Sequence, residues 1–410
     1  MSYFQKILTD IRFFKVFVLG IVSGMPFAIL YTTIIAWMNQ FELNFELVTH
    51  LALARMPYSF KFLWSPMLEY FTPPLLGRLL GKRRSWMFLS SLGIAGILYY
   101  MSTLTPTDEN FSFLWSLSLG LGFLAASYDI SYDALRIEIL DQDEQAIGVA
   151  HASFAYRIGV LLTGALALVV AQDHGWEYTF KMLSLFFAIG AFASCVMQTP
   201  DSKNIQTNFV STTIESFKDL LKRPYSWLIM LTIVFYKVGD AMLAVVGMKF
   251  YTHLGFSLKE IAFVVKTCSL VATYIGCYAG AFIMSRSHGV WGLIVCEIAQ
   301  SVTNLGYIWL NHAGHDITVF LITNISENFT SGMGGAALGG YIANLCNVRF
   351  AATHFALLSS LATLMNSTFT SQAGYLVGQM GWNNYFIFTT VISIPSLFML
   401  WILHKKLNKS

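Results

Sequence analysis

The chain has 410 residues, of which 56% are hydrophobic and only 11% are charged. A soluble domain carries about 25% charged residues, so this composition excludes an ordinary water-soluble protein and indicates a membrane protein. The formal net charge is only +3, and we expect no nucleic-acid partner. The five cysteines lie in apolar segments without paired spacing. They indicate neither a disulfide framework nor a zinc site, and we expect no metal or cofactor.

Long apolar segments follow one another along the whole chain. Lys6, Arg12 and Lys15 precede the first of them, which runs from 16 to 37 and is too long for the apolar region of a signal peptide. A helix needs about 20 residues to cross a hydrocarbon core about 30 Å thick. We therefore predict an all-α membrane protein with twelve transmembrane helices, at residues 13–37, 47–69, 84–104, 111–137, 146–171, 178–198, 226–251, 259–284, 289–311, 316–345, 351–379 and 384–403.

One connection between these helices is longer than the others. Residues 199–225 begin as a polar stretch and become amphipathic over 212–221. We predict that this segment separates two six-helix halves, residues 1–200 and 226–410, and forms a linker at 201–225.

A short motif indicates that the two halves are related. The pattern Gly-Trp-x-x-x-Phe occurs at Gly175 and again at Gly381, 206 residues later, each time close to the last predicted helix of a half. A repeat at half the chain length is what a duplication would leave. Six plus six helices is the plan of the major facilitator superfamily fold, and we predict that fold.

Lysine and arginine gather in alternate loops, while the intervening loops carry acidic residues and histidines. Positive residues stay on the cytoplasmic side of a membrane, so we expect both termini and the linker to be cytoplasmic. Lys259 is the clearest exception. The basic loops hold Lys6, Arg12, Lys15, Arg78, Lys82, Arg83, Arg84, Lys203, Lys218, Lys222, Arg223, Arg286, Arg349, Lys405, Lys406 and Lys409.

The sequence lacks the motifs of the common enzyme classes. It has no phosphate-binding loop of the type G-x-x-x-x-G-K-[ST], no H-E-x-x-H and no G-x-S-x-G. The glycine-rich run from Gly332 to Gly340 lies inside an apolar helix, where small residues favour close helix packing over dinucleotide binding. We expect a transporter, not an enzyme.

Ionisable residues inside the predicted spans of the first half mark a candidate site for protons. An ionisable group near the bilayer centre costs about 2.5–3.5 kcal/mol on insertion scales and usually marks a transport pathway. Asp129 and Asp133 are four residues apart and share one helix face, and Arg157 lies in the next helix. We predict that Asp129, Asp133 and Arg157 couple transport to protons. A static ion pair between the two helices is the alternative.

The second half carries further polar groups at membrane depth. Lys237 and Asp240 are three residues apart, so they can either meet a charged substrate or form a salt bridge within the helix. Lys266 has no acidic residue in the membrane-embedded part of its own helix, and Glu327 with Asn328 lies near the midplane. We predict that all five residues bind substrate in a polar central cavity.

Aromatic residues accompany these charges in both halves. Tyr128 and Tyr156 stand next to Asp129 and Arg157 in the sequence. Aromatic faces can stack on sugar rings, so we add these two tyrosines to the predicted substrate site. Placement at the lipid interface is the default for membrane aromatics and remains the alternative.

The motifs around these charges resemble the AmpG muropeptide permease family of the major facilitator superfamily, along nearly the whole chain. The matching residues are Ser23-Gly24-Met25-Pro26, Lys61-Phe62-Leu63-Trp64-Ser65-Pro66, Thr72-Pro73-Pro74, Arg83-Arg84-Ser85-Trp86, Asp129-Ile130, Asp133-Ala134, Tyr156-Arg157, Tyr236-Lys237, Gly239-Asp240-Ala241, Lys266-Thr267, Glu327-Asn328, Gly332-Met333-Gly334, Cys346-Asn347, Ala352-Thr353 and Phe355-Ala356-Leu357-Leu358-Ser359. Five places depart from the family pattern, and one of them is a longer basic turn after Pro74, from Gly77 to Arg84. Glu69-Tyr70 stands for Asp-Arg, Tyr128 and His354 stand for glutamine, and Asn366 stands for arginine.

The resemblance implies a proton-driven importer of N-acetylglucosamine–anhydro-N-acetylmuramic acid and its peptides, for peptidoglycan recycling. Its implied partners are this glycopeptide, protons and the lipid bilayer of a bacterial inner membrane, and we expect a monomer. Two alternatives stay open. The chain could transport another anionic solute, such as an acyl-CoA-like molecule or another glycoconjugate, or it could sense muropeptides without moving them.

Overall fold

The computed structural model describes residues 10–41, 43, 51–197, 209–287 and 290–407. Within these residues the chain is helical and contains no strand. It folds as two compact units. The first unit consists of Met1–Asp141, His151–Phe217 and Cys346–Ser360, and the second of Gln142–Ala150, Lys218–Leu345 and Leu361–Ser410. The predicted boundaries at 200 and 226 stay a prediction, and residues 198–208 of the linker lie outside the described part.

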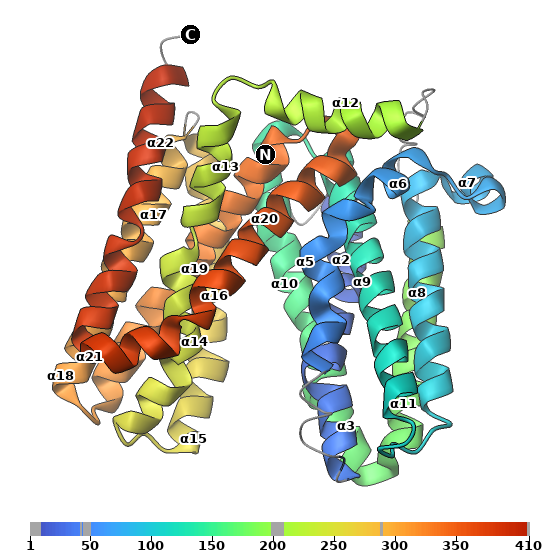
Figure 1. The fold of residues 1–410 in the computed structure, drawn as a ribbon, viewed down its shortest axis with the longest axis horizontal. Helices are drawn as coiled ribbons and strands as arrows, with labels where there is room; N and C mark the ends of the chain where they lie inside the picture. The colour runs from blue at the N-terminus through green and yellow to red at the C-terminus, as the bar shows by residue number, and fades with distance from the viewer. Residues whose placement is uncertain (1–9, 42, 44–50, 198–208, 288–289, 408–410) are drawn as a thin grey trace. The chain divides into compact units, whose positions relative to one another are not determined.

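The first unit holds the helices of the first half of the chain. In Figure 1, α8, α9 and α11 run side by side through this unit. The parts of α10, α12 and α20 that belong to it are residues 151–163, 209–217 and 351–360. The elements are α2 (Ile11–Ala28), η1 (Ile29–Thr33), α3 (Ile34–Gln40), η2 (Leu51–Arg55), α5 (Met56–Phe60), η3 (Lys61–Leu63), α6 (Ser65–Tyr70), α7 (Pro74–Leu80), α8 (Lys82–Met101), α9 (Phe111–Ile139), α10 (Gln145–Thr163), α11 (Ala165–Val196), α12 (Phe209–Leu221), η6 (Val348–Phe350) and α20 (Ala351–Ser371).

The second unit holds the remaining helices, together with the short η4 (Gln142–Glu144). Its core is built from apolar residues of α14, α18, α19 and α21, among them Phe250, Tyr307 and Phe386. The elements are α13 (Ser226–Phe235), α14 (Val238–His253), α15 (Leu258–Ile261), η5 (Ala262–Cys268), α16 (Ser269–Arg286), α17 (Trp291–Asn304), α18 (Gly306–Ala313), α19 (Ile317–Leu345), α21 (Ala373–Val391) and α22 (Ile394–Leu407).

The helices confirm the predicted fold class. Each of the twelve predicted spans coincides with helix in the described residues. Eight described helical stretches are long and apolar enough to cross a membrane, and one of them, Gln142–Val196, has 55 residues. At 1.5 Å per residue it would be about 80 Å long, far more than a core of about 30 Å. It therefore accounts for two predicted spans.

The repeated Gly-Trp motif reverses the chain in both units. Gly175 has φ 81° and ψ 170°, and Gly381 has φ 74° and ψ 169°. Only glycine adopts this backbone conformation readily. The tryptophan that follows contacts the phenylalanine of the motif at a ring distance of 6.0 Å in both copies. The internal repeat seen in the sequence is thus repeated in backbone geometry.

Glycines bring pairs of helices into backbone contact inside each unit. A Cβ on Gly24 of α2 would lie 1.9 Å from the carbonyl oxygen of Tyr156 in α10. In the second unit, a Cβ on Gly276 of α16 would lie 1.9 Å from the carbonyl oxygen of Phe329 in α19, and one on Gly280 would lie 2.3 Å from that of Met333. Small residues permit such close packing in membrane proteins.

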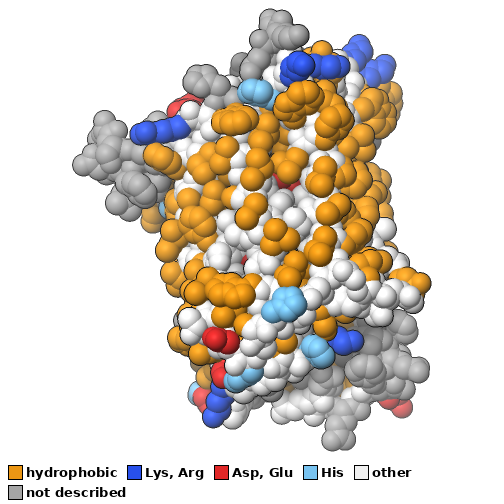
Figure 2. Space-filling view, turned by 90° about the vertical axis from the view of Figure 1, so that its left-hand side faces the viewer, with side chains coloured by type: hydrophobic (Ala, Val, Ile, Leu, Met, Phe, Trp, Pro, Cys, Tyr) orange, Lys and Arg blue, Asp and Glu red, His pale blue; other side chains and the backbone are white. Residues whose placement is uncertain are grey.

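The side of the molecule shown in Figure 2 has the surface of a membrane protein. Hydrophobic side chains form a broad band over its middle, and most Lys, Arg, Asp and Glu side chains lie toward its upper and lower ends. Large apolar residues of α17 and α22 are half exposed, including Trp291, Phe398 and Trp401. Exposed apolar residues in such a band meet lipid instead of water.

Candidate functional site

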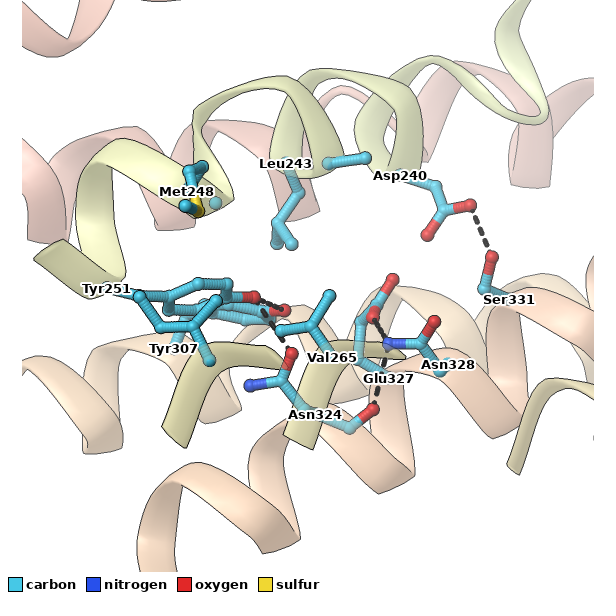
Figure 3. A pocket seen from close by; sticks show the side chains of 13 residues that line it. Asp240, Leu243, Met248, Tyr251, Val265, Tyr307, Asn324, Glu327, Asn328 and Ser331 are labelled. Atoms are coloured by element: carbon cyan, nitrogen blue, oxygen red, sulfur yellow. Dashed lines mark hydrogen bonds between the residues drawn. The ribbon is translucent and has the colours of Figure 1, made fainter. Parts of the chain in front are cut away.

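The second unit contains a partly open cavity of about 540 Å³, whose mainly apolar wall carries several polar side chains. It is lined by α14, α18, α19 and the segment around η5 (Figure 3). Three predicted site residues, Asp240, Glu327 and Asn328, lie on its wall with apolar and aromatic neighbours. Ligand cavities of about 300–1,000 Å³ with a few convergent polar groups are typical of small-molecule sites.

Lys237 lies at a break in the seventh predicted helix. Helix α13 ends at Phe235 and α14 starts at Val238. The Lys237 ammonium lies within hydrogen-bond distance of four oxygens: Asp240 Oδ2 at 2.7 Å, Ser331 O at 2.9 Å, Gln300 Oε1 at 3.1 Å and Ser331 Oγ at 3.2 Å. An ammonium has three N–H groups, so these partners leave none of them for a further ligand.

Asp240 and Glu327 face each other across the cavity wall. Asp240 Oδ2 accepts hydrogen bonds from Lys237 and from Ser331 Oγ, the latter at 2.7 Å. Asp240 Oδ1 is buried and accepts no hydrogen bond from an N–H or O–H group of the other described residues. The carboxyl group of Glu327 lines the same cavity, and Figure 3 shows both carboxyl groups turned into the same space.

Amides and phenols complete this part of the cavity. Asn328 donates to Glu327 Oε2 at 2.7 Å and to the carbonyl oxygen of Asn324 at 3.0 Å. Tyr251 donates to Asn324 Oδ1 at 2.8 Å and lies 3.0 Å from the hydroxyl of Tyr307. The backbone of Lys266 belongs to η5, but its side chain lies outside the described ones, so its predicted role in binding stays a prediction.

The charged residues of the first unit form a separate group. Asp129 accepts a hydrogen bond from Ser23 of α2 at 2.5 Å. Asp133 pairs with Arg136 at 3.3 Å and with Lys61 of η3 at 3.9 Å. Lys61 is a cation inside the predicted span 47–69, but the sequence did not indicate that it pairs with Asp133. Its partner could not be found from spacing, because it lies on another helix.

The remaining predicted residues of the first unit take different positions. Tyr128 is buried, and its hydroxyl donates to the carbonyl oxygen of Leu19 at 3.1 Å. Tyr156 is half-buried and packs edge-on against Phe27 at 5.9 Å. Arg157 is half-buried on α10. The structure thus gives Tyr128 a packing contact between α2 and α9, and the predicted roles of all three residues stay predictions.

Two of the departures from the family pattern lie in packed surroundings. His354 is buried, accepts from the backbone N–H of Asn347 at Nδ1 and lies 2.9 Å from the carbonyl oxygen of Ser216 through Nε2. A ring that accepts at Nδ1 and donates at Nε2 is neutral. Like Tyr128, His354 therefore binds backbone groups within the first unit and does not line the cavity of the second.

A second buried ion-pair network, which the sequence did not predict, lies at one end of the first unit. Arg83 donates to Glu69 at 2.5 Å and to Glu138 at 2.6 Å; Arg83 and Glu69 are buried, and the Glu138 side chain is 9% exposed. Burial alone would lower the pKa of Arg83, but Glu138 and Glu69 raise it overall. The other oxygen of Glu69 accepts the backbone N–H groups of Ala352 and Thr353 at 2.8 and 3.3 Å. A carboxylate at these N–H groups is favoured by the dipole of α20.

Comparison with known proteins agrees with this architecture. The family model of the Major Facilitator Superfamily matches residues 16–371. The chain also resembles the human organic anion transporter MFSD10 in structure, with a TM-score of 0.66 at 14% identity, covering 96% of this chain and 99% of that one. The match to the family model, together with the helices and the membrane surface, defines a multi-pass membrane transporter of that superfamily, not an enzyme.

Two relatives show to which family of this superfamily the chain belongs. The chain is 41% identical to a protein of Rickettsia felis named "Putative transporter AmpG 4", over 98% of this chain and 99% of that protein. It is 30% identical to a protein of Escherichia coli K12 named "Anhydromuropeptide permease", over 99% of this chain and 82% of that protein. The chain belongs to the AmpG family of the Major Facilitator Superfamily.

Proposed function

We propose that this protein imports anhydro-muropeptides, N-acetylglucosamine–anhydro-N-acetylmuramic acid and its peptides, together with protons. The observation that carries the proposal is the 30% identity, along nearly the whole chain, to the anhydromuropeptide permease of Escherichia coli. The expected setting is a bacterial inner membrane, with both termini in the cytoplasm and the protein acting as a monomer. The asymmetric distribution of Lys and Arg among the loops supports this orientation.

The cavity of the second unit supports binding of a polar, uncharged part of a substrate. Its wall combines the hydroxyls of Tyr251 and Tyr307 with the amides of Asn324 and Asn328. Hydroxyls and amides can donate and accept hydrogen bonds, which suits the acetamido and hydroxyl groups of an amino sugar. In this proposal Asn328 contacts substrate directly. Lys237, Asp240, Lys266 and Glu327 are proposed to set the charge of this site. Tyr128 and Tyr156 of the first unit are proposed separately to contact substrate.

The carboxylates of the first unit are proposed to take part in proton coupling. Asp129 and Asp133 lie on one face of α9, and Lys61 and Arg136 neutralise part of their charge. Membrane carboxylates beside cations are common in proton relays. Arg157 of α10, the next long helix along the chain, is proposed to adjust the proton affinity of these two carboxyl groups.

Uptake of a labelled anhydro-disaccharide peptide into proteoliposomes tests the function. We expect accumulation under an inward proton gradient, with loss of accumulation when a protonophore is added. Asp133→Asn should abolish accumulation, whereas Glu177→Gln, an exposed glutamate of the same unit, should not change it. Binding of the peptide without uptake would favour a sensor. Absence of both, in folded and correctly oriented protein, would favour a different anionic solute.

A further inference from the structure

We propose that the carboxyl pair Asp240–Glu327 binds one proton and that Glu327 is the residue that takes it up and releases it. From the sequence, Asp129 and Asp133 are predicted to couple transport to protons, and Glu327 is predicted to bind substrate. The geometry of the second unit assigns a proton to Glu327 as well. This inference rests on the proposed proton-coupled transport, and one of the experiments below tests it without substrate.

Asp240 is held in its ionised form by its surroundings. Its Oδ2 receives the ammonium of Lys237 at 2.7 Å and the hydroxyl of Ser331 at 2.7 Å. Asp240 also lies in the first turn of α14, where the free N–H groups and the helix dipole favour a negative charge. Three features therefore stabilise a carboxylate at this position.

Among the described side chains, Glu327 has no comparable support for a charge. It lies in the middle of α19, 6% exposed, and its Oε2 accepts only the neutral amide of Asn328 at 2.7 Å. Lys237 directs its N–H groups to Asp240, Gln300 and Ser331. Two carboxylates that meet in a buried site cannot both be ionised without a large cost.

The unsatisfied oxygen of Asp240 locates the proton. Asp240 Oδ1 is buried without an N–H or O–H from the groups described around it, and the Glu327 carboxyl group is turned into the same space (Figure 3). A hydrogen bond between two carboxyl groups exists only while one of them carries a proton. A proton on Glu327 donated to Asp240 Oδ1 satisfies both groups at once.

The same pair can link protonation to the shape of the cavity. With Glu327 protonated, Lys237, Asp240 and Glu327 together carry no net charge. Loss of the proton leaves one net negative charge between α14 and α19, two helices that both line the cavity. Among the described residues, Lys237 is the cation bonded to Asp240, so it would be drawn from Ser331 and Gln300 toward Glu327. Substrate and proton would then compete for the same hydrogen-bond donors.

The other titratable groups near the pair come from four elements. Tyr251 of α14 and Tyr307 of α18 line the cavity with it. On α17, Glu297 is fully buried and accepts from Ser396 at 2.7 Å, and it lies close enough to Lys237 and Asp240 for their charges to interact. Lys266 belongs to η5, and its side chain is outside those described. A pH dependence of transport that is assigned to Glu327 must therefore be compared with the pH dependence of the Glu297→Gln variant.

Infrared difference spectroscopy on the full-length protein in detergent tests proton binding directly and needs no substrate. At neutral pH, wild type minus Glu327→Gln should contain a carboxylic acid C=O band that disappears when the sample is titrated to high pH. Wild type minus Glu260→Gln, which changes an exposed glutamate of the same unit, should lack that band. If the Glu327→Gln difference contains only carboxylate bands, the proposal is wrong, whatever the protein transports.

Transport assays then separate proton binding from substrate binding. Glu327→Gln should keep exchange of labelled for unlabelled anhydro-disaccharide peptide across the membrane but lose accumulation driven by a proton gradient. The control Glu260→Gln should keep both activities. Accumulation by Glu327→Gln would refute the proposal. Loss of exchange as well, with the variant still folded by size-exclusion chromatography, would assign Glu327 to substrate binding and equally overturn it.

Discussion

Replacing Gly276 by alanine should weaken the contact between α16 and α19. The added Cβ would lie 1.9 Å from the backbone oxygen of Phe329, whereas ordinary contact begins at 3.4 Å. The two helices would have to separate by about 1.5 Å at this point, because a backbone oxygen inside a helix cannot rotate away. A gap of about 0.5–1 Å already costs a quarter to a half of the dispersion energy of the atoms involved.

The size of the effect follows from two opposing contributions. Overpacking in a close-packed interior costs about 1–3 kcal/mol, and the upper end applies here because both sides of the contact are backbone. Alanine recovers about 1 kcal/mol through its higher helix propensity. We therefore expect Gly276→Ala to lower the free energy of unfolding by about 2 kcal/mol.

The matched control is Gly335→Ala on α19, because a Cβ there would meet no atom within 4 Å. This variant should be as stable as wild type or slightly more stable. The measurement is the fraction of monodisperse protein after heating in detergent, supported by unfolding in a denaturing detergent. Equal stability of the two variants would show that α16 and α19 adapt to the extra carbon, and the reasoning from backbone contact would fail.

Three further changes test other parts of the structure. Lys237→Met should destabilise the protein by about 3–5 kcal/mol, because it leaves the carboxylate of Asp240 buried without a cation; adding Asp240→Asn should recover most of this loss in thermal unfolding. Glu69→Gln should cost about 1.5–3 kcal/mol through its weakened bonds to Arg83, and an unchanged melting temperature would show that Glu138 alone suffices. Gly175→Ala should cost about 1–3 kcal/mol through backbone strain alone, since no atom lies near the added carbon; a melting temperature equal to wild type would mean that the turn can relax.

The sequence predicted the fold because hydrophobic length is a local property. Each span is visible as about 20 apolar residues, and the Gly-Trp repeat is visible as letters. The pair Lys237–Asp240 could also be predicted, since residues three apart on a helix are neighbours. The break in the helix at Lys237 could not, because Tyr236 and Val238 carry no helix-breaking signal.

Contacts between residues far apart along the chain could not be predicted from the sequence. The carboxyl group of Glu69 meets backbone N–H groups of Ala352 and Thr353, almost 300 positions away. The facing of Asp240 and Glu327 depends likewise on how α14 packs against α19. Spacing along one helix can suggest which residues share a face, but it cannot say which residue of another helix that face meets.

The two Gly-Trp turns have kept one shape while acquiring different neighbours. The indole N–H of Trp176 donates to Gln40 at 2.6 Å, whereas the ring of Trp382 rests 4.9 Å from that of Phe250. The same backbone path thus occurs twice in the chain with different contacts around it. The hexapeptide from Gly175 to Phe180 should accordingly be exchangeable with the one from Gly381 to Phe386 as a turn, but not as a set of side chains.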